Sequence, residues 1–495
     1  MRWIVAIALT LSFSVPARGQ TLDRGLEFFD SGDFEDAALA LYDVVWSSPD
    51  ANARNEAVVY LGLTLQRMGL WGPASYYFAE ILKQGPTNRR YLNAVEQLLE
   101  VQDKYRDHVL VAASIDQFFD GAAFANLPNG NRIDQINYLM GEFNLRRGKV
   151  RNSGRFLEFV RPESPYYAQA RYLLGISALR QNEPKVATEH FQSVVGAIPE
   201  DSGDRDQSRL RQLAQLALAR AAYGVGDFEG SVAAFRAVPR YSEFWFQALY
   251  EQAWAHYQLG RYGEALGSLE STLSPYFAKR HVPEAYVIQA TTYFSYCQWD
   301  RVRRSVERYK SIYEPMKQEL EAYLAGQQNP RATQILEDLF KGGAGKYPEE
   351  IAREVRRVGW FKDLYYSLRH LEWQQEQIES LGAWRGSRMV RDLKLMIDDR
   401  LADTRDFAAR WVLQRLRYHA GSLKNFQAQI DILDFELVDA ERQWLEQGRE
   451  ILKGRRARLP RPEIPNDQWQ HWGITGEHWR DELGYYQHTM QSECN

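Results

Sequence analysis

The segment Gly32-Asp33-Phe34-Glu35-Asp36-Ala37 is the most informative part of this sequence, because its pattern returns several times along the chain of 495 residues. The glycine adopts positive φ at little steric cost, so one helix ends there and a second begins. Phe34 and Ala37 are expected to pack between the two helices. Gly25 lies upstream, where a small residue lets the second helix approach closely. Pro49 closes the unit because proline does not continue a helix.

Six further segments keep the same internal order, and the spacing between neighbouring units is often 34 residues. The small residues of the seven first helices are Gly25, Gly62, Gly141, Gly175, Ala219, Ala253 and Ala290. A two-helix unit of this kind cannot bury its apolar face alone, so neighbouring units stack. The sequence therefore predicts an all-α array of helix pairs.

These residues resemble the tetratricopeptide repeat family, whose period is about 34 residues. The resemblance covers most of residues 21–315. It implies a right-handed superhelical solenoid of about seven helix pairs over residues 20–315, with a divergent helical stretch at 87–130. It also implies a non-enzymatic scaffold that binds protein partners in a groove. From the register of the motif, we expect five first-helix residues to line this groove: Tyr60, Asn137, Arg171, Gln215 and Tyr250.

The composition predicts a folded chain that has no extended basic surface for binding nucleic acid. Hydrophobic residues make up 45% of the chain, which excludes a largely disordered protein. The formal net charge is −4 with both signs interspersed, so no overall basic surface is predicted. The basic run at 453–458 is interpreted as a solvated helix end, with contact to an anionic envelope surface as the alternative.

The N-terminus has the pattern of an export signal. Arg2 precedes a mostly apolar run from Ile4 to Val15, which is too short to span a membrane comfortably. Small residues at Ala17 and Gly19 predict cleavage before Gln20, so residues 1–19 are expected to be a signal peptide and the mature protein periplasmic. An ordinary first helix is the alternative. No later transmembrane segment is expected.

The two cysteines, Cys297 and Cys494, leave two states open. In an oxidising compartment they could form a disulfide that ties the C-terminal tail to the seventh repeat. Two cysteines 197 positions apart do not prove a bond, and two free thiols are the default.

The repeat pattern stops in the C-terminal third. Residues 316–387 are predicted to form short helices, and residues 388–455 one long heptad helix or a helical hairpin that turns at Gly421-Ser422. The apolar heptad positions are Leu423, Phe426, Ile430, Leu433, Leu437, Ala440, Trp444 and Ile451. This stripe must be buried, either against the solenoid or against a partner.

The Pro-rich tail at 456–495 is unusually aromatic. Its expected docking residues are Trp469, Trp472, Trp479, Tyr485 and Tyr486. The tail either folds back onto the helical body or docks another envelope component. The run Trp479-Arg480-Asp481-Glu482-Leu483-Gly484-Tyr485-Tyr486 resembles the C-termini of periplasmic tetratricopeptide proteins of myxobacteria, some of which belong to the adventurous gliding-motility machinery. That resemblance implies a place in an envelope complex.

The motifs of catalysis are not found in the sequence. The loop at 340–347 lacks the first glycine and the final Ser or Thr of a phosphate-binding loop. His471, His478 and His488 match no metal-ligand spacing, so neither a metal nor a cofactor is predicted. The sequence favours a non-enzymatic periplasmic scaffold. The alternatives are a metal-dependent or enzymatic envelope protein that uses the tail, and a structural spacer across the periplasm.

Overall fold

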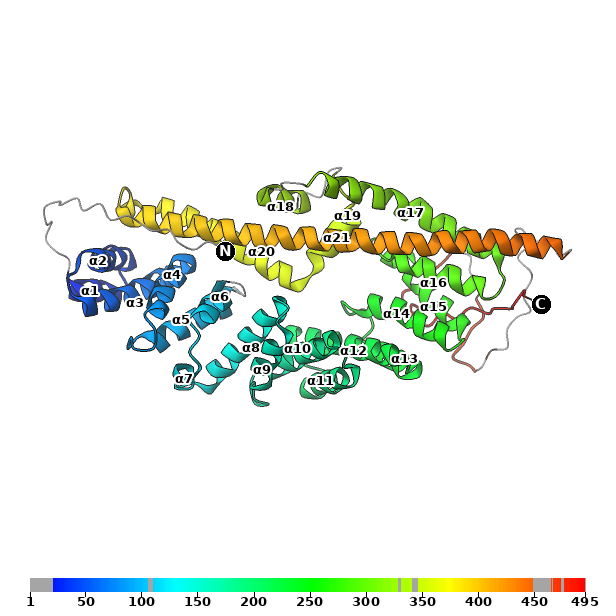
Figure 1. Ribbon diagram of the computed structural model, residues 1–495, viewed down its shortest axis with the longest axis horizontal. Coiled ribbons are helices and arrows are strands. Elements are labelled where there is room, and N and C mark those ends of the chain that lie inside the picture. Colours follow the sequence, from blue (N-terminus) through cyan, green and yellow to red (C-terminus); the bar gives the residue numbers. More distant parts are fainter. Residues whose placement is uncertain are drawn as a thin grey trace. The chain divides into compact units, whose positions relative to one another are not determined.

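A computed structural model describes residues 21–105, 110–327, 331–340, 346–447, 464, 466–472 and 476–494. Within these ranges every regular element is a helix and none is a strand (Figure 1). The chain divides into two compact units, which are described separately: unit 1 comprises residues 1–128 and 366–403, and unit 2 comprises 129–365 and 404–495. The predicted signal peptide at 1–19, the basic run at 453–458 and Ile451 lie outside the described residues.

Unit 1 contains the first two predicted helix pairs and the divergent stretch that follows them. Its helices are α1 (Leu22–Ser31), α2 (Phe34–Ser47), α3 (Ala51–Arg67), α4 (Trp71–Lys83), α5 (Tyr91–Tyr105), α6 (Leu110–Gln117) and α7 (Gly121–Phe124). It also holds the second part of α20 (Gly359–Ser380), the 3-10 helix η2 (Gly382–Trp384) and the first part of α21 (Arg388–Glu446).

Unit 2 contains the other helix pairs and the helices after them. These are α8 (Gly130–Arg146), α9 (Val150–Glu158), α10 (Tyr167–Arg180), α11 (Pro184–Ala197), α12 (Arg205–Gly224), α13 (Phe228–Arg236), α14 (Trp245–Gln258), α15 (Tyr262–Thr272), η1 (Pro275–Phe277), α16 (Pro283–Phe294), α17 (Trp299–Ala325), α18 (Ala332–Phe340) and α19 (Glu349–Arg357). The first part of α20 and the remainder of α21 complete unit 2.

All seven predicted turns between paired helices have the same backbone geometry. The turn residue has positive φ in each pair: Gly32, Gly69, Gly148, Asn182, Gly226, Gly260 and Cys297. In the first pair, Gly32 N–H donates to Phe29 O at 3.2 Å and Asp33 N–H donates to Phe28 O at 2.9 Å. The same two bonds recur in the other six pairs, which is the Schellman motif.

The small residue of the first helix is required by the second helix of its own pair. A Cβ atom added to Gly62 would lie 2.6 Å from Phe78 Cε1, and one added to Gly175 would lie 2.4 Å from Phe191 Cε1. Gly25 and Gly141 are covered in the same way by leucines. The predicted reason for this position, close approach of the paired helices, is confirmed.

The first two pairs of unit 1 are joined to the helices that come late in the chain. The indole of Trp71 donates to His370 Nδ1 at 2.9 Å, and the Gly72 amide donates to Gln374 Oε1 at 2.8 Å. The indole of Trp384 donates to the carbonyl of Glu35 at 3.0 Å. Residues distant in sequence therefore build one compact unit.

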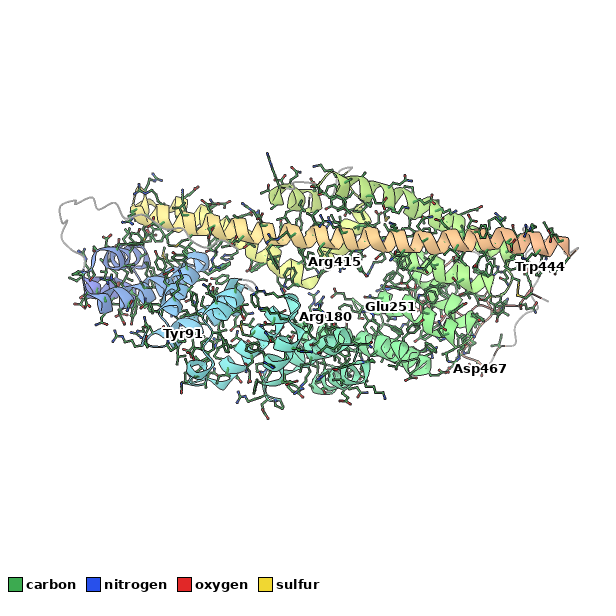
Figure 2. All side chains as sticks on the ribbon, in the orientation of Figure 1. Tyr91, Arg180, Glu251, Arg415, Trp444 and Asp467 are labelled. Carbon is green, nitrogen blue, oxygen red and sulfur yellow. A yellow bond between two sulfur atoms is a disulfide. The ribbon has the colours of Figure 1, made fainter. Side chains whose placement is uncertain are left out.

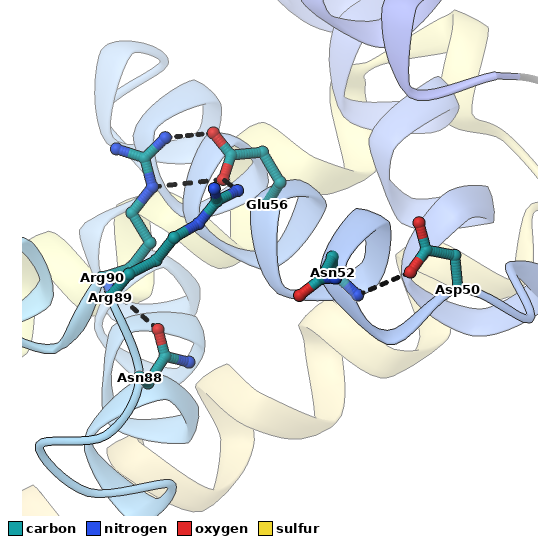
Figure 3. Close-up of polar contacts among 6 residues, drawn as sticks. All are labelled: Asp50, Asn52, Glu56, Asn88, Arg89 and Arg90. Atoms are coloured by element: carbon teal, nitrogen blue, oxygen red, sulfur yellow. Dashed lines mark hydrogen bonds and ion pairs between the residues drawn. The ribbon is translucent and has the colours of Figure 1, made fainter.

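A carboxylate links the second repeat of unit 1 to the segment after it (Figure 3). Glu56 on α3 contacts the guanidinium groups of Arg89, at 2.9 Å, and Arg90. Burial raises the pKa of Glu56, but the hydrogen bonds and charges of the two arginines outweigh burial and lower it overall. Asp50 caps α3 by accepting from the Asn52 amide at 2.9 Å.

The region after the repeats agrees in part with the predicted series of short helices, since α18 and α19 have 9 residues each. α17 continues through Pro315, so the predicted boundary at 315 falls inside a helix of 27 residues. The helix persists because Tyr313 before the proline and Met316, Leu320 and Tyr323 after it are buried on one face. α20 is also long, with 22 residues.

The heptad region forms one helix, because α21 runs without interruption through Gly421-Ser422 for 59 residues, or about 90 Å. In unit 2 its apolar stripe is buried: Leu423, Ile430 and Leu437 have no exposed surface. α17 lies alongside α21 (Figure 1). The Tyr309 hydroxyl donates to Leu423 O at 3.2 Å, and Lys310 Nζ lies 2.7 Å from Asp434 Oδ2. The stripe therefore packs against the chain's own helices.

Among the described residues, no helix has both the length and the apolar character needed to cross a membrane.

Candidate interaction surface

A row of aromatic and charged side chains runs along the first helices of successive repeats in unit 2. We call it the first-helix strip, and its members are Tyr172, Arg220, Tyr250, Glu251, Trp254 and Glu284. Tyr172 and Tyr250 lie three residues before the small residues Gly175 and Ala253, and Trp254 lies one residue after Ala253. Positions four apart share one face of a helix, so the repeat register brings these side chains together.

Arg220 on α12 and Glu251 on α14 form a bidentate ion pair. Arg220 Nε lies 2.7 Å from Glu251 Oε2, and a terminal guanidinium nitrogen lies 2.6 Å from Oε1. The Arg220 side chain is 47% exposed and that of Glu251, labelled in Figure 2, is 16% exposed. Paired planar groups of this kind hold a fixed geometry. The pair thus fixes two neighbouring repeats and leaves a guanidinium face open to solvent.

The next link joins α14 to α16. The Trp254 indole donates to Glu284 Oε1 at 2.8 Å. Burial raises the pKa of Glu284, and the indole hydrogen bond opposes this only in part. Burial also raises the pKa of the Tyr250 hydroxyl, with the charges of Glu251 and Glu284 acting in the same direction. The strip therefore combines carboxylates of low hydration with amphipathic rings.

The side chains of the strip can bind both the main chain and the side chains of a polypeptide. Half-buried carboxylates accept hydrogen bonds from peptide amides or cationic side chains, and an exposed guanidinium face stacks on aromatic rings. Tyr and Trp supply a large contact area with few rotatable bonds. Arg, Trp and Tyr are also the residues that dominate binding energy at protein interfaces.

The segment 349–361 borders the strip within unit 2. Arg280 Nε lies 3.2 Å from Glu354 Oε1, and its guanidinium lies 4.3 Å from the centre of the Phe246 ring. The guanidinium of Arg146 at the end of α8 lies 4.5 Å from the ring centre of Trp360. The Phe246 ring centre lies 5.9 Å from that of Tyr250, so this segment lies next to one end of the strip.

The predicted groove residues do not all share the face of the strip. Tyr250 belongs to it, whereas Gln215 is buried at 6% exposure. Arg171 on α10 lies with its guanidinium 4.8 Å from the ring centre of Tyr167. Tyr60, whose ring centre is 5.3 Å from that of Phe29, belongs to unit 1, and Asn137 is half-buried on α8.

The predicted groove residues stand two, three or four positions before the small residue of their repeat. Because successive side chains of a helix are rotated by about 100°, these positions lie on different faces. The prediction did not include the other five members of the strip, which are Tyr172, Arg220, Glu251, Trp254 and Glu284. A single register, three residues before the small residue and one after it, would have identified Tyr172, Arg220 and Trp254.

The predicted docking residues of the tail lie on the surface of unit 2. Trp469, Trp472, Trp479 and Tyr485 are 38%, 48%, 48% and 55% exposed. The rings of Trp472 and Trp479 are 4.7 Å apart, and the guanidinium of Arg240 lies 4.4 Å from the Tyr485 ring centre. The hydroxyl of Tyr486 accepts from the Trp479 amide at 3.0 Å. Whether these side chains dock another protein stays a prediction.

Across the part of the chain that the structure describes, no three His, Cys, Asp or Glu side chains are arranged to hold a metal ion. His478 and His488 both face one carboxylate, that of Glu270 on α15, at 2.9 and 3.6 Å.

Residues 216–276 match the family model of the tetratricopeptide repeat. This stretch contains Arg220, Tyr250, Glu251 and Trp254 of the strip. No curated protein matches the chain. A solved tetratricopeptide repeat protein from Parabacteroides merdae is 13% identical, with 59% of this chain and 91% of that one covered and a TM-score of 0.26.

A second solved structure, the TPR domain of P58(IPK), is 14% identical, with 77% of this chain and 98% of that one covered and a TM-score of 0.19. The helix pairs and the family match together define an all-α protein with tetratricopeptide-like repeats. Repeats of this class typically serve as scaffolds for protein interaction rather than as enzymes.

Proposed function

We propose that this protein is a non-enzymatic scaffold that binds a protein partner through the first-helix strip of unit 2. The observation that carries the proposal is the ordered row Arg220–Glu251, Tyr250 and Trp254–Glu284 across three neighbouring repeats. A helix or an extended segment laid across the strip would contact several repeats at once.

We further propose that the scaffold acts in the periplasm as part of a cell-envelope complex of the gliding-motility type. The export pattern at residues 1–19 supports the location, and the resemblance of the tail at 479–486 supports the type of complex. The location is tested by expressing the full chain in a Gram-negative host. We expect a mature protein that begins at Gln20 and appears in the periplasmic fraction; an uncleaved cytosolic chain contradicts the proposal.

The partner site is tested by photo-crosslinking in living cells of the source organism. A photoreactive phenylalanine analogue replaces Tyr250, and the matched control carries it at Phe159, which is 73% exposed and belongs to α9's C-terminal cap, away from the strip. We expect a discrete protein adduct from position 250 that is lost when Trp254→Ala is added. Adducts of equal yield from both positions, or none from position 250, would exclude the strip as the binding site.

A further inference from the structure

The C-terminal segment at 476–494, which we call the strap, lies along α13–α16 of unit 2 (Figure 1). Three of its backbone amides donate to the repeats. Gly484 N–H donates to Ser271 Oγ at 2.8 Å, His488 N–H to Gly263 O at 3.0 Å, and Glu493 N–H to Tyr296 O at 3.0 Å. The strap is thus held partly by its main chain, as a bound peptide is.

The surface of α15 is shaped for this backbone. Gly263, Gly267 and Ser271 stand four residues apart and so form one line along the helix. A Cβ atom on Gly267 would lie 1.7 Å from Tyr486 O, and one on Gly263 would lie 2.4 Å from His488 O. Any larger side chain on this line would displace the strap.

One strap side chain enters the repeat core. Leu483 is 1% exposed and belongs to a buried cluster with Leu216, Phe235, Trp245 and Leu249. The next residue, Gly484, has a φ of +88°, which favours glycine over other residues. The repeats therefore recognise the strap through a buried leucine that is followed by glycine.

Polar groups fix the strap at the leucine and in the residues just before it. A terminal nitrogen of Arg240 donates to Asp481 O at 2.6 Å and to Leu483 O at 3.1 Å. The hydroxyl of Tyr241 donates to Arg480 O at 2.7 Å. These contacts are made to carbonyls of the turn at 480–485, so they position its backbone with little regard to its side chains.

A disulfide closes the end of the strap. Cys494 is bonded to Cys297, and their Cα atoms are 5.0 Å apart. Cys297 is the turn residue between α16 and α17, at the position where five other pairs carry glycine. The covalent link therefore joins the tail to the repeat array itself.

We propose that the surface formed by Arg240, Gly263, Gly267, Ser271 and the Leu483 cluster is a second peptide-binding site. Its ligand is a segment that turns at a leucine-glycine pair, as residues 480–485 do, and continues with tyrosines. The strap is its resident ligand, and the Cys297–Cys494 bond keeps that ligand in place. This site uses none of the first-helix strip, so it stands or fails independently of the proposed function.

Opening of the site needs a dithiol reductant. One thiolate of the dithiol attacks a sulfur of the disulfide, the Cys297–Cys494 bond breaks, and a mixed disulfide forms. The second thiolate of the reductant then displaces the protein sulfur. The protein pair gains two electrons and two protons and becomes two thiols, while the reductant becomes a disulfide. The strap is then held by non-covalent contacts alone.

The first test uses the full chain with Leu483→Asp, Cys297→Ser and Cys494→Ser, whose own strap has neither anchor nor bond. The probe is a fluorescent peptide of residues 476–494 with Cys494→Ser, followed by anisotropy. We expect saturable binding to this variant and at least tenfold weaker binding to the oxidised wild-type protein. The peptide with Leu483→Asp should bind at least tenfold more weakly, and the peptide with Glu477→Ala, an exposed position, should bind unchanged.

Matched glycine substitutions in the protein locate the bound peptide. Gly267→Ala should abolish binding, whereas Gly154→Ala on α9, where a Cβ meets nothing within 4 Å, should not. A folded variant that does not bind the peptide would overturn the proposal. So would binding that Gly267→Ala leaves intact, or equal binding to the oxidised wild-type protein.

The second test needs no substitution and decides the matter if the triple variant does not fold. Amide hydrogen exchange is measured for residues 484–493 in the oxidised wild-type protein and after reduction by dithiothreitol. We expect protection to fall at least tenfold on reduction while α8–α11 remain protected. Unchanged protection of the strap would show that the disulfide does not control the site.

Discussion

The imidazole of His281 lies edge-on to that of His419 on α21, with ring centres 5.4 Å apart, inside unit 2. Burial lowers the pKa of His281 to about 3 and the pKa of His419 to about 4, and each ring's positive form would repel its neighbours. Arg415 acts on His419 in the same direction. The long helix is therefore joined to the repeats by two rings that must stay neutral.

This pair predicts a loss of stability in mild acid. Both folded pKa values lie below the ordinary value of 6.5, so the unfolded chain binds protons first as the pH falls. Stability is full above about pH 6.5 and declines towards pH 4, by on the order of 2 kcal/mol per histidine at pH 5. Melting curves at pH 7.5 and 5 measure the decline. The variant His281→Gln/His419→Gln should reduce the decline, part of which remains because burial also lowers the pKa of His256 to about 4, whereas His471→Gln in the exposed tail should leave the decline unchanged.

The glycine of the first helix predicts a second outcome. Gly175→Ala should destabilise the protein by about 1–3 kcal/mol, because the added methyl group meets the fully buried ring of Phe191. The control is Gly154→Ala, which adds the same methyl group to an open helix surface and should be neutral or stabilising by up to about 1 kcal/mol. Urea unfolding of both variants gives the comparison, and equal midpoints would refute the packing argument.

The third prediction concerns the turn between α12 and α13. Gly226→Ala should destabilise by about 1–2 kcal/mol because this residue has a φ of +81°. Gly224→Ala, two residues earlier at the end of α12, places its methyl group in open space and should be tolerated. The difference between the two urea midpoints isolates the backbone conformation from side-chain contact.

These turns also show which features of the fold can be predicted from the sequence. Glycine at the turn and a small residue before it are local signals, so the helix pairs could be predicted. Asn182 and Cys297 could be placed only by counting from neighbouring repeats, yet both have positive φ. The site was harder. Tyr250 was predicted, but Arg220 and Glu251 become partners only when α12 and α14 stack.

The tail shows the same limit at longer range. Its five aromatic residues were conspicuous in the sequence, but the side chain that enters the core is Leu483. The cavity that takes Leu483 is built by residues 216–249, more than 230 positions away. Likewise unit 1 combines residues 1–128 with residues 366–403, and no local periodicity in the sequence predicts this.

The long helix predicts a fourth outcome through two isoleucines that lie two residues apart. Ile430 has no exposed surface, whereas Ile432 is 57% exposed. Ile430→Ala should destabilise by about 2–4 kcal/mol through the cavity it leaves, and Ile432→Ala should change stability by less than about 0.5 kcal/mol. Thermal and urea unfolding measure both. Similar losses from the two variants would mean that the stripe around Ile430 is not the packed face.

Glu270 predicts the last outcome, in the strap. His488 and His478 lower the pKa of this carboxyl, against an opposing effect of burial, so the group contributes stability above its ordinary pKa of 4.5. That contribution disappears as the pH falls through the lower, folded value. Glu270→Gln should remove on the order of 1 kcal/mol at pH 7 and increase amide exchange at residues 484–488. Glu477→Gln, an exposed change within the strap, should alter neither measurement.

Because the Glu270 carboxylate faces both histidines of the strap, loss of its charge should weaken the attachment of the strap more than the stability of α15. If melting shifts but exchange at 484–488 does not, Glu270 stabilises its own helix rather than the strap.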